Sequence, residues 1–392
     1  MILPRLDLLI YAHDGRGLGH ASRGIAVGMA VRRLFPSMRV LFVSGCREAA
    51  ELIAGAPLDW IKLPSYESQV VDGKSRGKEG CSRFSSKEIG IIRGELIRAI
   101  VRTHDPRCVL VDHSPQGKHR ELLPALRDGE PGRIKWVLGM RAVIGDVNSV
   151  WSEMALSTFK AHYQGIVWYG DSTILGDDPL RNIFRRYGVR PLEVGYVSRM
   201  QELIHLDQDL KETAGKDVAG TVSVPWMGES TSSLLREISK GLEMLGDRHG
   251  QWHLYLGFRV IEETEPEVKE ALKAMPFCIV RQVGPRYIKS LLNSKVSLIY
   301  GGYNSLTDVL CARRPSVVVL RGMQDREQED HVAKLADYTG NLVFLEDRDA
   351  DSERLYRELR SLLDSAAPAG RGVNLNGAEN TAKVLAGLME GP

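Results

Sequence analysis

The sequence has few of the features that mark the specialised classes of protein. Its five cysteines are scattered without CxxC spacing, so neither a disulfide framework nor a zinc site is indicated. No apolar run approaches the roughly 18 to 20 residues needed to span a bilayer, and Met1–His13 contains acid and lacks a secretory layout. With 52 basic and 50 acidic side chains, the formal net charge is +2. This is far below the positive charge that is typical of proteins that bind nucleic acid along their whole surface. We therefore expect a cytoplasmic protein that does not bind nucleic acid.

Two common nucleotide-binding motifs are also missing. Residues 14–23 read DGRGLGHASR, so Ser22 stands where a G-x-G-x-x-G motif needs its third glycine, and the second predicted strand ends in Ser44-Gly45 without an acid. No G-x-x-x-x-G-K-[ST] segment occurs, which excludes the usual P-loop. Glycines still let the backbone approach an anionic or polar ligand at a helix N-terminus. The alternative is a tight turn that binds nothing.

The composition and its periodicity predict two α/β domains. The chain has 392 residues, 43% of them hydrophobic and 26% charged, which is enough apolar material for two cores. Apolar runs alternate with amphipathic stretches, as in helices layered on parallel sheets. We expect domains at 1–198 and 199–372 and a last helix within 373–392. Strands are predicted at 6–13, 39–44, 59–63, 108–112, 134–139, 165–169, 193–197, 221–224, 252–257, 277–281, 296–300, 316–320 and 342–345.

A second glycine turn carries more information than the first. The apolar strand 296–300 runs into Gly301-Gly302, and a helix is predicted to follow. Its free N–H groups, with the side chains of Asn304 and Ser305, could hold a phosphate. Asp308 lies one turn deeper, where a carboxylate could accept hydrogen bonds from vicinal hydroxyls. The alternative is an ordinary helix cap with a solvated acid.

Together these segments resemble a GT-B glycosyltransferase, in particular the group around the peptidoglycan N-acetylglucosaminyltransferase and the related bacterial predicted glycosyltransferases. Residues 17–20 with Arg23 are similar to the family's amino-terminal G-x-G-H-x-x-R loop. Residues 300–305 with Asp308 resemble its nucleotide-sugar box, and residues 325–328 its donor-sugar loop. Short matches at 111–115, 138–141 and 194–197 follow in the same order. The resemblance implies two Rossmann-like parallel-sheet domains that face a central cleft.

The resemblance also implies an inverting, metal-independent transfer of a sugar from a nucleotide diphosphate sugar, with UDP-sugar first, to an acceptor hydroxyl, and no separate cofactor. The diphosphate would meet Gly302, Asn304 and Ser305, the ribose would meet Asp308, the base would meet the turn at 283–284, and the sugar would meet residues 327–328. The residues implied for nucleotide-sugar binding are Gly17, Gly19, Ser230, Val283, Gly284, Gly302, Asn304, Ser305, Asp308, Glu327 and Gln328.

The sequence departs from the family pattern at three places. Tyr300 stands where the plant-type box has a phosphate-binding histidine, and Asp308 replaces a longer glutamate. The first loop of the second domain, residues 224–230, is not glycine-rich, although Ser230 and Thr231 could cap the next helix. Trp226 in this loop is expected to serve as packing or as a gate.

An inverting transfer needs a base, and an imidazole with a pKa near 6.5 suits that task. His20, in the first glycine loop, is the first candidate, and Asp112 and His113, at the end of another strand, are the second. The alternative for His20 is a hydrogen bond to the donor phosphate or to backbone. His13 is expected to be a packing residue at a strand end.

Other activities remain open at this point. A nucleotide-sugar hydrolase or 2-epimerase occurs on similar scaffolds, and a non-catalytic nucleotide-sugar-binding subunit is a further alternative. The basic segment 71–87 is expected to be a long polar loop. Together with the mixed apolar and basic segment 89–93, it could touch an anionic membrane or an acidic acceptor, or be an ordinary solvated loop.

Overall fold

The computed structural model describes residues 5–13, 18–71, 74–78, 83–130, 132–142, 152–207, 210, 218–228, 230–284, 286–320, 327–365 and 371–390, with backbone only at 67–71, 74–78 and 327–328. The chain folds into two compact units. Unit 1 contains residues 1–202 and 374–392, and unit 2 contains residues 203–373.

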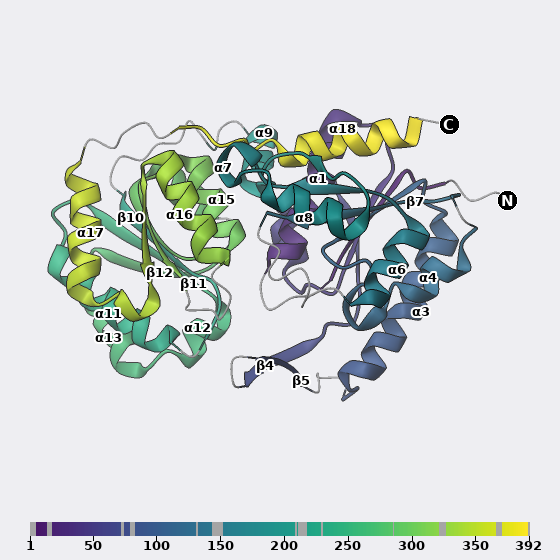
Figure 1. Cartoon of the computed structure of the whole chain (residues 1–392). Helices are drawn as coiled ribbons and strands as arrows, with labels where there is room; N and C mark the ends of the chain where they lie inside the picture. The colour runs from purple at the N-terminus through teal and green to yellow at the C-terminus, as the bar shows by residue number, and fades with distance from the viewer. Residues whose placement is uncertain are drawn as a thin grey trace. The chain divides into compact units, whose positions relative to one another are not determined.

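The described residues of unit 1 form a seven-stranded parallel sheet (Figure 1). Its strands, in spatial order, are β3 (Asp59–Lys62), β2 (Val40–Ser44), β1 (Leu8–Ala12), β6 (Cys108–Asp112), β7 (Lys135–Arg141), β8 (Tyr163–Tyr169) and β9 (Leu192–Glu193). Every residue of β1, β2 and β6 is buried. Because helices cover both faces of a parallel sheet, its central strands are continuous apolar runs rather than alternating ones.

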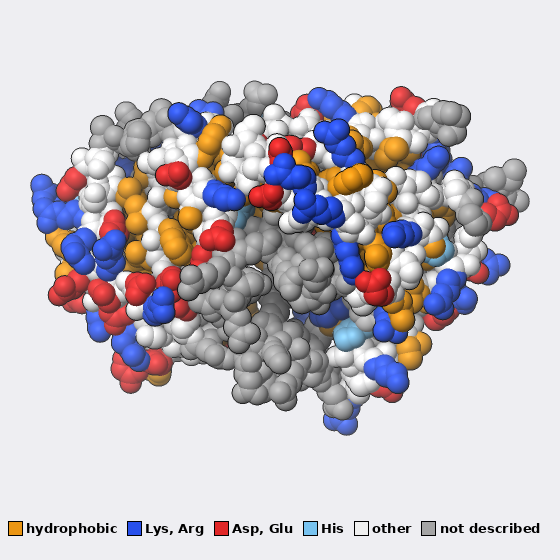
Figure 2. All heavy atoms as spheres, viewed as in Figure 1, with side chains coloured by type: hydrophobic (Ala, Val, Ile, Leu, Met, Phe, Trp, Pro, Cys, Tyr) orange, Lys and Arg blue, Asp and Glu red, His pale blue; other side chains and the backbone are white. Residues whose placement is uncertain are grey.

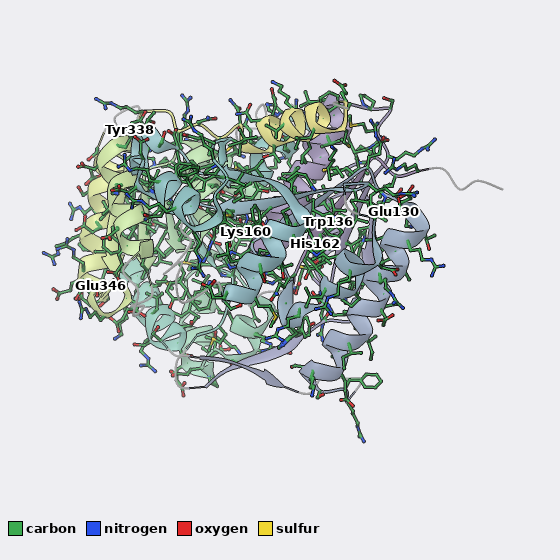
Figure 3. The ribbon with its side chains drawn as sticks, turned by 45° about the vertical axis from the view of Figure 1, so that its right-hand side comes forward. Glu130, Trp136, Lys160, His162, Tyr338 and Glu346 are labelled. Carbon is green, nitrogen blue, oxygen red and sulfur yellow. The ribbon has the colours of Figure 1, made fainter. Side chains whose placement is uncertain are left out.

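The helices of unit 1 are amphipathic segments between these strands. They are α1 (Gly19–Leu34), α2 (Ala49–Ile53), α3 (Ser86–His104), α4 (Leu123–Asp128), α6 (Glu153–His162), α7 (Ser172–Leu175), α8 (Asp178–Tyr187), α9 (Arg199–Leu206), which spans the division between the units, and α18 (Gly377–Glu390). Where α6 leads into β8, Trp136 of β7 pairs in register with Tyr163, next to His162 (Figure 3). The C-terminal helix α18 packs against α1, and Arg33 of α1 bonds to both Glu202 and Glu379.

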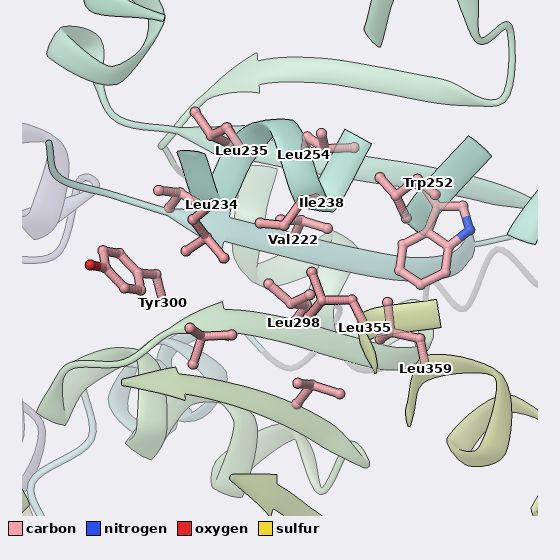
Figure 4. Packing of buried hydrophobic residues seen from close by; sticks show 14 of the residues in the cluster. Val222, Leu234, Leu235, Ile238, Trp252, Leu254, Leu298, Tyr300, Leu355 and Leu359 are labelled. Atoms are coloured by element: carbon pink, nitrogen blue, oxygen red, sulfur yellow. The ribbon is translucent and has the colours of Figure 1, made fainter. Parts of the chain in front are cut away.

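The described residues of unit 2 form a six-stranded parallel sheet. Its strands, in spatial order, are β12 (Cys278–Gln282), β11 (Gln251–Leu256), β10 (Val218–Val224), β13 (Ser294–Tyr300), β14 (Ser316–Leu320) and β15 (Leu342–Glu346). The helices are α11 (Thr231–Leu245), α12 (Phe258–Glu263), α13 (Pro266–Ala274), α14 (Arg286–Asn293), α15 (Tyr303–Ala312), α16 (Glu327–Thr339) and α17 (Ser352–Asp364). On one face of this sheet, Leu235 and Ile238 of α11 and Leu355 of α17 pack over Val222 and Leu298 (Figure 4).

Each sheet has one place where its strand order reverses. In unit 1, β1 lies between β2 and β6, and in unit 2, β10 lies between β11 and β13. In open parallel sheets, ligands bind outside the carboxyl ends of the strands at such a point. The loops that follow β1, β6, β10 and β13 are therefore where the candidate site residues must be examined.

The segment 71–87 differs from its expected form. Instead of one long loop, strands β4 (Glu67–Val71) and β5 (Lys74–Lys78) pair as an antiparallel hairpin, and α3 begins at Ser86. The surface expected at 89–93 is also wrong for three of its residues, because Ile89 and Gly90 are buried and Arg93 is fully buried. Arg93 donates to Glu121 and to the Pro64 carbonyl, so its charge is neutralised inside the unit.

Charged side chains are mixed over the described surface. On the face shown in Figure 2, Lys and Arg side chains are interspersed with Asp and Glu side chains, in keeping with the formal net charge of +2. Within the described parts of the chain, no helix is long and apolar enough to cross a membrane.

Candidate functional site

In unit 1, two of the predicted base candidates meet where the strand order reverses. His20 lies in the first turn of α1, and Asp112 is the last residue of β6. His20 Nδ1 contacts Asp112 Oδ2 directly. Arg23, on the same helix as His20, donates from Nε to Asp112 Oδ1 at 3.1 Å and from Nη2 to Oδ2 at 2.9 Å. The side chains of Arg23 and Asp112 are only 3% and 4% exposed, whereas that of His20 is 18% exposed.

These contacts fix the protonation of the ring. Burial alone would raise the pKa of Asp112, but the charge of Arg23 and the hydrogen bonds from His20 and Arg23 outweigh it and hold the pKa well below its usual range. An ionised carboxylate only accepts hydrogen bonds, so the proton of the His20 ring lies on Nδ1 and the lone pair on Nε2. Burial and the neighbouring His13 lower the pKa of His20 well below its ordinary value, so the ring is neutral at pH 7. This arrangement can accept a proton at Nε2.

Two more imidazoles surround His20. His13 follows β1, and its ring centroid is 4.0 Å from that of His20. His113 follows β6 in a left-handed backbone conformation, φ +75°, with its ring centroid 5.4 Å from that of His20. Burial, with the nearby His13 and Arg141, lowers the pKa of His113 to about 3. Burial lowers the pKa of both rings, so the electrostatics do not rank them as a base for a hydroxyl proton, and it is the contact of His20 Nδ1 with Asp112 that favours His20 in that role.

In unit 2, the segment expected to hold the diphosphate forms the N-terminus of α15. Gly302 is the N-cap residue of this helix, and a side chain at Gly302 would meet nothing within 4 Å. At Gly301, in contrast, a Cβ atom would lie 2.4 Å from the Leu320 side chain. The second glycine therefore leaves open space beside the first-turn N–H groups, where an anion is stabilised. Asn304, in the first turn, is half-buried.

Two further residues implied by the box follow along the same helix. Ser305 and Asp308 are half-buried on α15. Asp308 lies close to Tyr287 of α14. Burial is the largest cause of the raised pKa of the Tyr287 hydroxyl, and the negative charge of Asp308 is the second largest. The carboxylate of Asp308 is therefore at the margin of the core, where it is placed to accept hydrogen bonds from a ligand.

The first loop of unit 2 does not act as expected. Ser230 precedes α11, but its side chain makes no cap and instead donates to Asp347 Oδ2 at 2.7 Å. Thr231 Oγ1 accepts from the Gly228 N–H at 2.8 Å. The Asp347 carboxylate beside Ser230 disfavours a diphosphate at that hydroxyl. The Trp226 ring stacks on Tyr300, with centroids 4.8 Å apart and an interplanar angle of 23°, as the packing alternative predicts.

The remaining predicted residues fall into two groups. In the first, the Val283 N–H already donates to the Leu256 carbonyl, and the Gly284 carbonyl accepts from the Tyr287 N–H. The Val283 N–H is therefore occupied, while the Val283 carbonyl and the Gly284 N–H could still recognise a base. Gly19 begins α1 next to His20. In the second group, Gly17 and residues 325–326 lie outside the described residues, and Glu327 and Gln328 begin α16 with side chains outside them.

Sequence reasoning missed three contributors to these sites. Arg23 was recognised as part of a motif, but no role was assigned to it. A spacing of three residues nevertheless places it on the same face of a helix as His20. His13 was expected to pack at a strand end, and its ring does lie 4.0 Å from that of His20, but its effect on the pKa of that ring was not predicted. Nothing in the sequence connects Asp347 with Ser230, which is 117 residues away. Within the described side chains, no group of three or more His, Cys, Asp and Glu residues could hold a metal ion.

Two Rossmann-like parallel-sheet units, each with one point where its strand order reverses, define a GT-B fold. The solved structures that share it include a UDP-GlcNAc 2-epimerase from Neisseria meningitidis bound to UDP-GlcNAc, at a TM-score of 0.64 and 12% identity over 97% of this chain and 99% of that one. UGT71G1 from Medicago truncatula, complexed with UDP-glucose, has a TM-score of 0.61 and 12% identity over 98% of both chains.

Acinetobacter baumannii MurG has a TM-score of 0.55 and 12% identity over 99% of both chains. At these identities the likeness establishes the fold alone. No protein-family model matches the sequence, and no curated protein matches it. The predicted GT-B fold is confirmed, and the narrower resemblance to the peptidoglycan N-acetylglucosaminyltransferase group stays a prediction.

Proposed function

We propose that the protein is a cytoplasmic, inverting glycosyltransferase that moves a sugar from a nucleotide diphosphate sugar to an acceptor hydroxyl. A UDP-sugar is the favoured donor. The observation that carries the proposal is the contact of His20 Nδ1 with Asp112 Oδ2, from which we infer a neutral ring with its lone pair on Nε2. A fold shared with proteins that bind UDP-glucose and UDP-GlcNAc supports the donor class.

In the proposed reaction, His20 Nε2 accepts the proton of the acceptor hydroxyl as its oxygen attacks the anomeric carbon. The bond from that carbon to the donor phosphate breaks, and the nucleoside diphosphate leaves with the electron pair. One displacement inverts the anomeric configuration. The N-terminal end of α15, at Gly302, stabilises the charge that develops on the leaving group. Asn304 and Ser305 complete the phosphate site, and Asp308 binds the ribose.

A second candidate is supported by the solved structures, because a UDP-GlcNAc 2-epimerase shares the fold at a TM-score of 0.64. Epimerisation or hydrolysis would use the same donor site without an acceptor. The three reactions are separated by their products. Exchange of the sugar C2 proton with deuterated solvent indicates an epimerase, and free sugar formed without acceptor indicates a hydrolase.

The test is a donor screen with UDP-, TDP- and GDP-sugars, in which released nucleotide is measured with and without a panel of hydroxyl acceptors. The proposal requires nucleotide release that depends on an acceptor, and a product whose anomeric configuration is opposite to that of the donor by NMR. Activity should persist in the presence of a chelator. Release without acceptor, or solvent exchange at C2, would replace the proposal with one of the two alternatives. Binding without any turnover would favour a non-catalytic subunit.

A further inference from the structure

Two hydrogen-bond donors converge on one oxygen of Asp112. Arg23 Nη2 and His20 Nδ1 both reach Oδ2, and the two nitrogens are therefore 3.0 Å apart. Arg23 Nε also donates a hydrogen bond to Oδ1, so the guanidinium binds the carboxylate with two parallel hydrogen bonds. The arginine is thus as closely engaged with Asp112 as the histidine is.

This geometry changes what Asp112 can do for the ring. In a pair of histidine and aspartate alone, the carboxylate both orients the ring and stabilises the imidazolium. Here the single negative charge is already matched by a buried guanidinium. A second proton on His20 would place another positive charge within about 3 Å of Arg23, and among the described residues no second carboxylate contacts the ring to balance it.

We propose that Arg23 is a positioning residue of the reaction: it fixes the Asp112 carboxylate, and its charge adds to burial and to His13 in keeping the His20 ring neutral, with Nε2 ready to accept a proton. The inference rests on the proposed function, because it assigns Arg23 its part through His20. Arg23 is too deeply buried, at 3% exposure, to meet a substrate itself.

The groups around His20 determine the direction of the effect. His13 at the end of β1 and His113 after β6 face the ring, and Arg141 at the end of β7 acts on His113. None of these groups is negative. Asp112 is the carboxylate in contact with the ring, so removing the charge of Arg23 releases it to stabilise the imidazolium. His20 should then protonate at a higher pH.

The test compares Arg23→Gln, which keeps an N–H donor but no charge, with Arg23→Lys, which keeps the charge but cannot make two parallel bonds. The matched control is Arg33→Gln on the same helix. Arg33 also grips a buried carboxylate with two bonds, to Glu202 at 3.0 and 3.1 Å, and is remote from the proposed chemistry. All three variants are compared by thermal unfolding.

The first readout does not depend on activity. The His20 ring is titrated by NMR in protein labelled with ¹⁵N-histidine, and its signal is assigned by its loss in His20→Gln. In Arg23→Gln the midpoint should move up by about one pH unit or more, which is at least a tenfold change in proton affinity. In Arg33→Gln it should stay in place. An unmoved midpoint in folded Arg23→Gln overturns the proposal, even if His20 is the base.

The second readout is the pH profile of kcat/KM. In Arg23→Gln the acid limb should shift upward by the same amount, so that the loss is greatest at pH values within and below the limb and disappears well above it. A role limited to folding predicts a loss that does not vary with pH, and that result contradicts the inference. In Arg23→Lys the acid limb should stay in place while kcat falls. If Arg23→Gln fails to fold, the proposal is tested with Arg23→Lys alone. An unchanged kcat in Arg23→Lys then overturns the proposal.

Discussion

Replacing His20 with alanine separates the two roles that its position allows. As the base, the ring accepts the hydroxyl proton, and its loss should lower kcat by about 10²- to 10⁴-fold, or about 2.7 to 5.5 kcal/mol in the barrier. As a phosphate ligand, the ring would donate a hydrogen bond to a charged group. Its loss would then weaken UDP binding by about 1.5 to 3 kcal/mol, which is roughly 10- to 150-fold.

The contacts of His20 indicate that the variant folds. Asp112 keeps both bonds from Arg23, so no buried carboxylate is left without a partner. The ring is 18% exposed, so its truncation should cost less than the loss of a fully buried aromatic side chain, and we expect about 1 to 2 kcal/mol. A change in turnover can therefore be assigned to chemistry once thermal unfolding has shown an intact fold.

The assay measures kcat at saturating donor and UDP affinity by calorimetry on the same preparation. We expect a large loss of kcat with UDP affinity within about twofold of the wild type, because the residues proposed for the phosphates and the ribose, Gly302 to Asp308, belong to unit 2. His113→Ala is the matched control from the same cluster, and it should keep turnover within about fivefold. Turnover and affinity both near wild type in His20→Ala would refute either role. A larger loss in His113→Ala would move the base to that residue.

Three further predictions concern binding and stability. Asp308→Ala should weaken UDP binding by about 1.5 to 3 kcal/mol, because ribose hydrogen bonds to a charged acceptor are lost, and unchanged affinity by calorimetry would contradict the ribose site. Glu121→Gln should lower the free energy of unfolding by about 3 to 5 kcal/mol in urea, because Arg93, with which Glu121 forms a fully buried ion pair, loses its counter-charge. The folded-state pKa of His113 is about 3, below its unfolded value near 6.5, so the unfolded chain binds more protons in that range. Its contribution to stability is complete above pH 6.5 and is lost by up to about 1.4 kcal/mol per pH unit as the pH falls toward 3, and His113→Asn should flatten this decline in chemical unfolding.

The parts of the fold that could be predicted are those set by local pattern. Strands β1 and β6 are uninterrupted apolar runs, and the turns at their ends are marked by glycine or by polar residues. The carboxyl ends of parallel strands share one edge of the sheet, so His20 and Asp112 were both expected near that edge, although as alternative base candidates and not as a pair. The hairpin of β4 and β5 could not be recognised, because Lys74–Lys78 is polar and has none of the apolar alternation of a half-buried strand.

The parts that could not be predicted depend on pairing across the sequence. An arginine in an amphipathic helix is usually solvated, so Arg93 was placed on the surface, and its partner Glu121 lies 28 residues away. The same limit applies to Ser230, whose hydroxyl was expected at the helix cap but donates to distant Asp347. Residue type and spacing indicate which groups carry the chemistry. Which carboxylate neutralises which cation is decided by tertiary packing.

The position of α18 has a consequence for the order in which the chain folds during synthesis. Unit 1 begins at the N-terminus but is completed by residues 374–392, so the whole of unit 2 is inserted within it. The returning chain joins the earlier part of unit 1 where the Tyr196 N–H donates a hydrogen bond to the Asn374 carbonyl at 2.8 Å. As the chain leaves the ribosome, unit 2 can close first, while α1, which carries His20 and Arg23, still lacks the helix that packs against it. The second unit to emerge should therefore be the first to resist proteolysis, and a nascent chain stalled before Gly377 should expose the apolar face of α1.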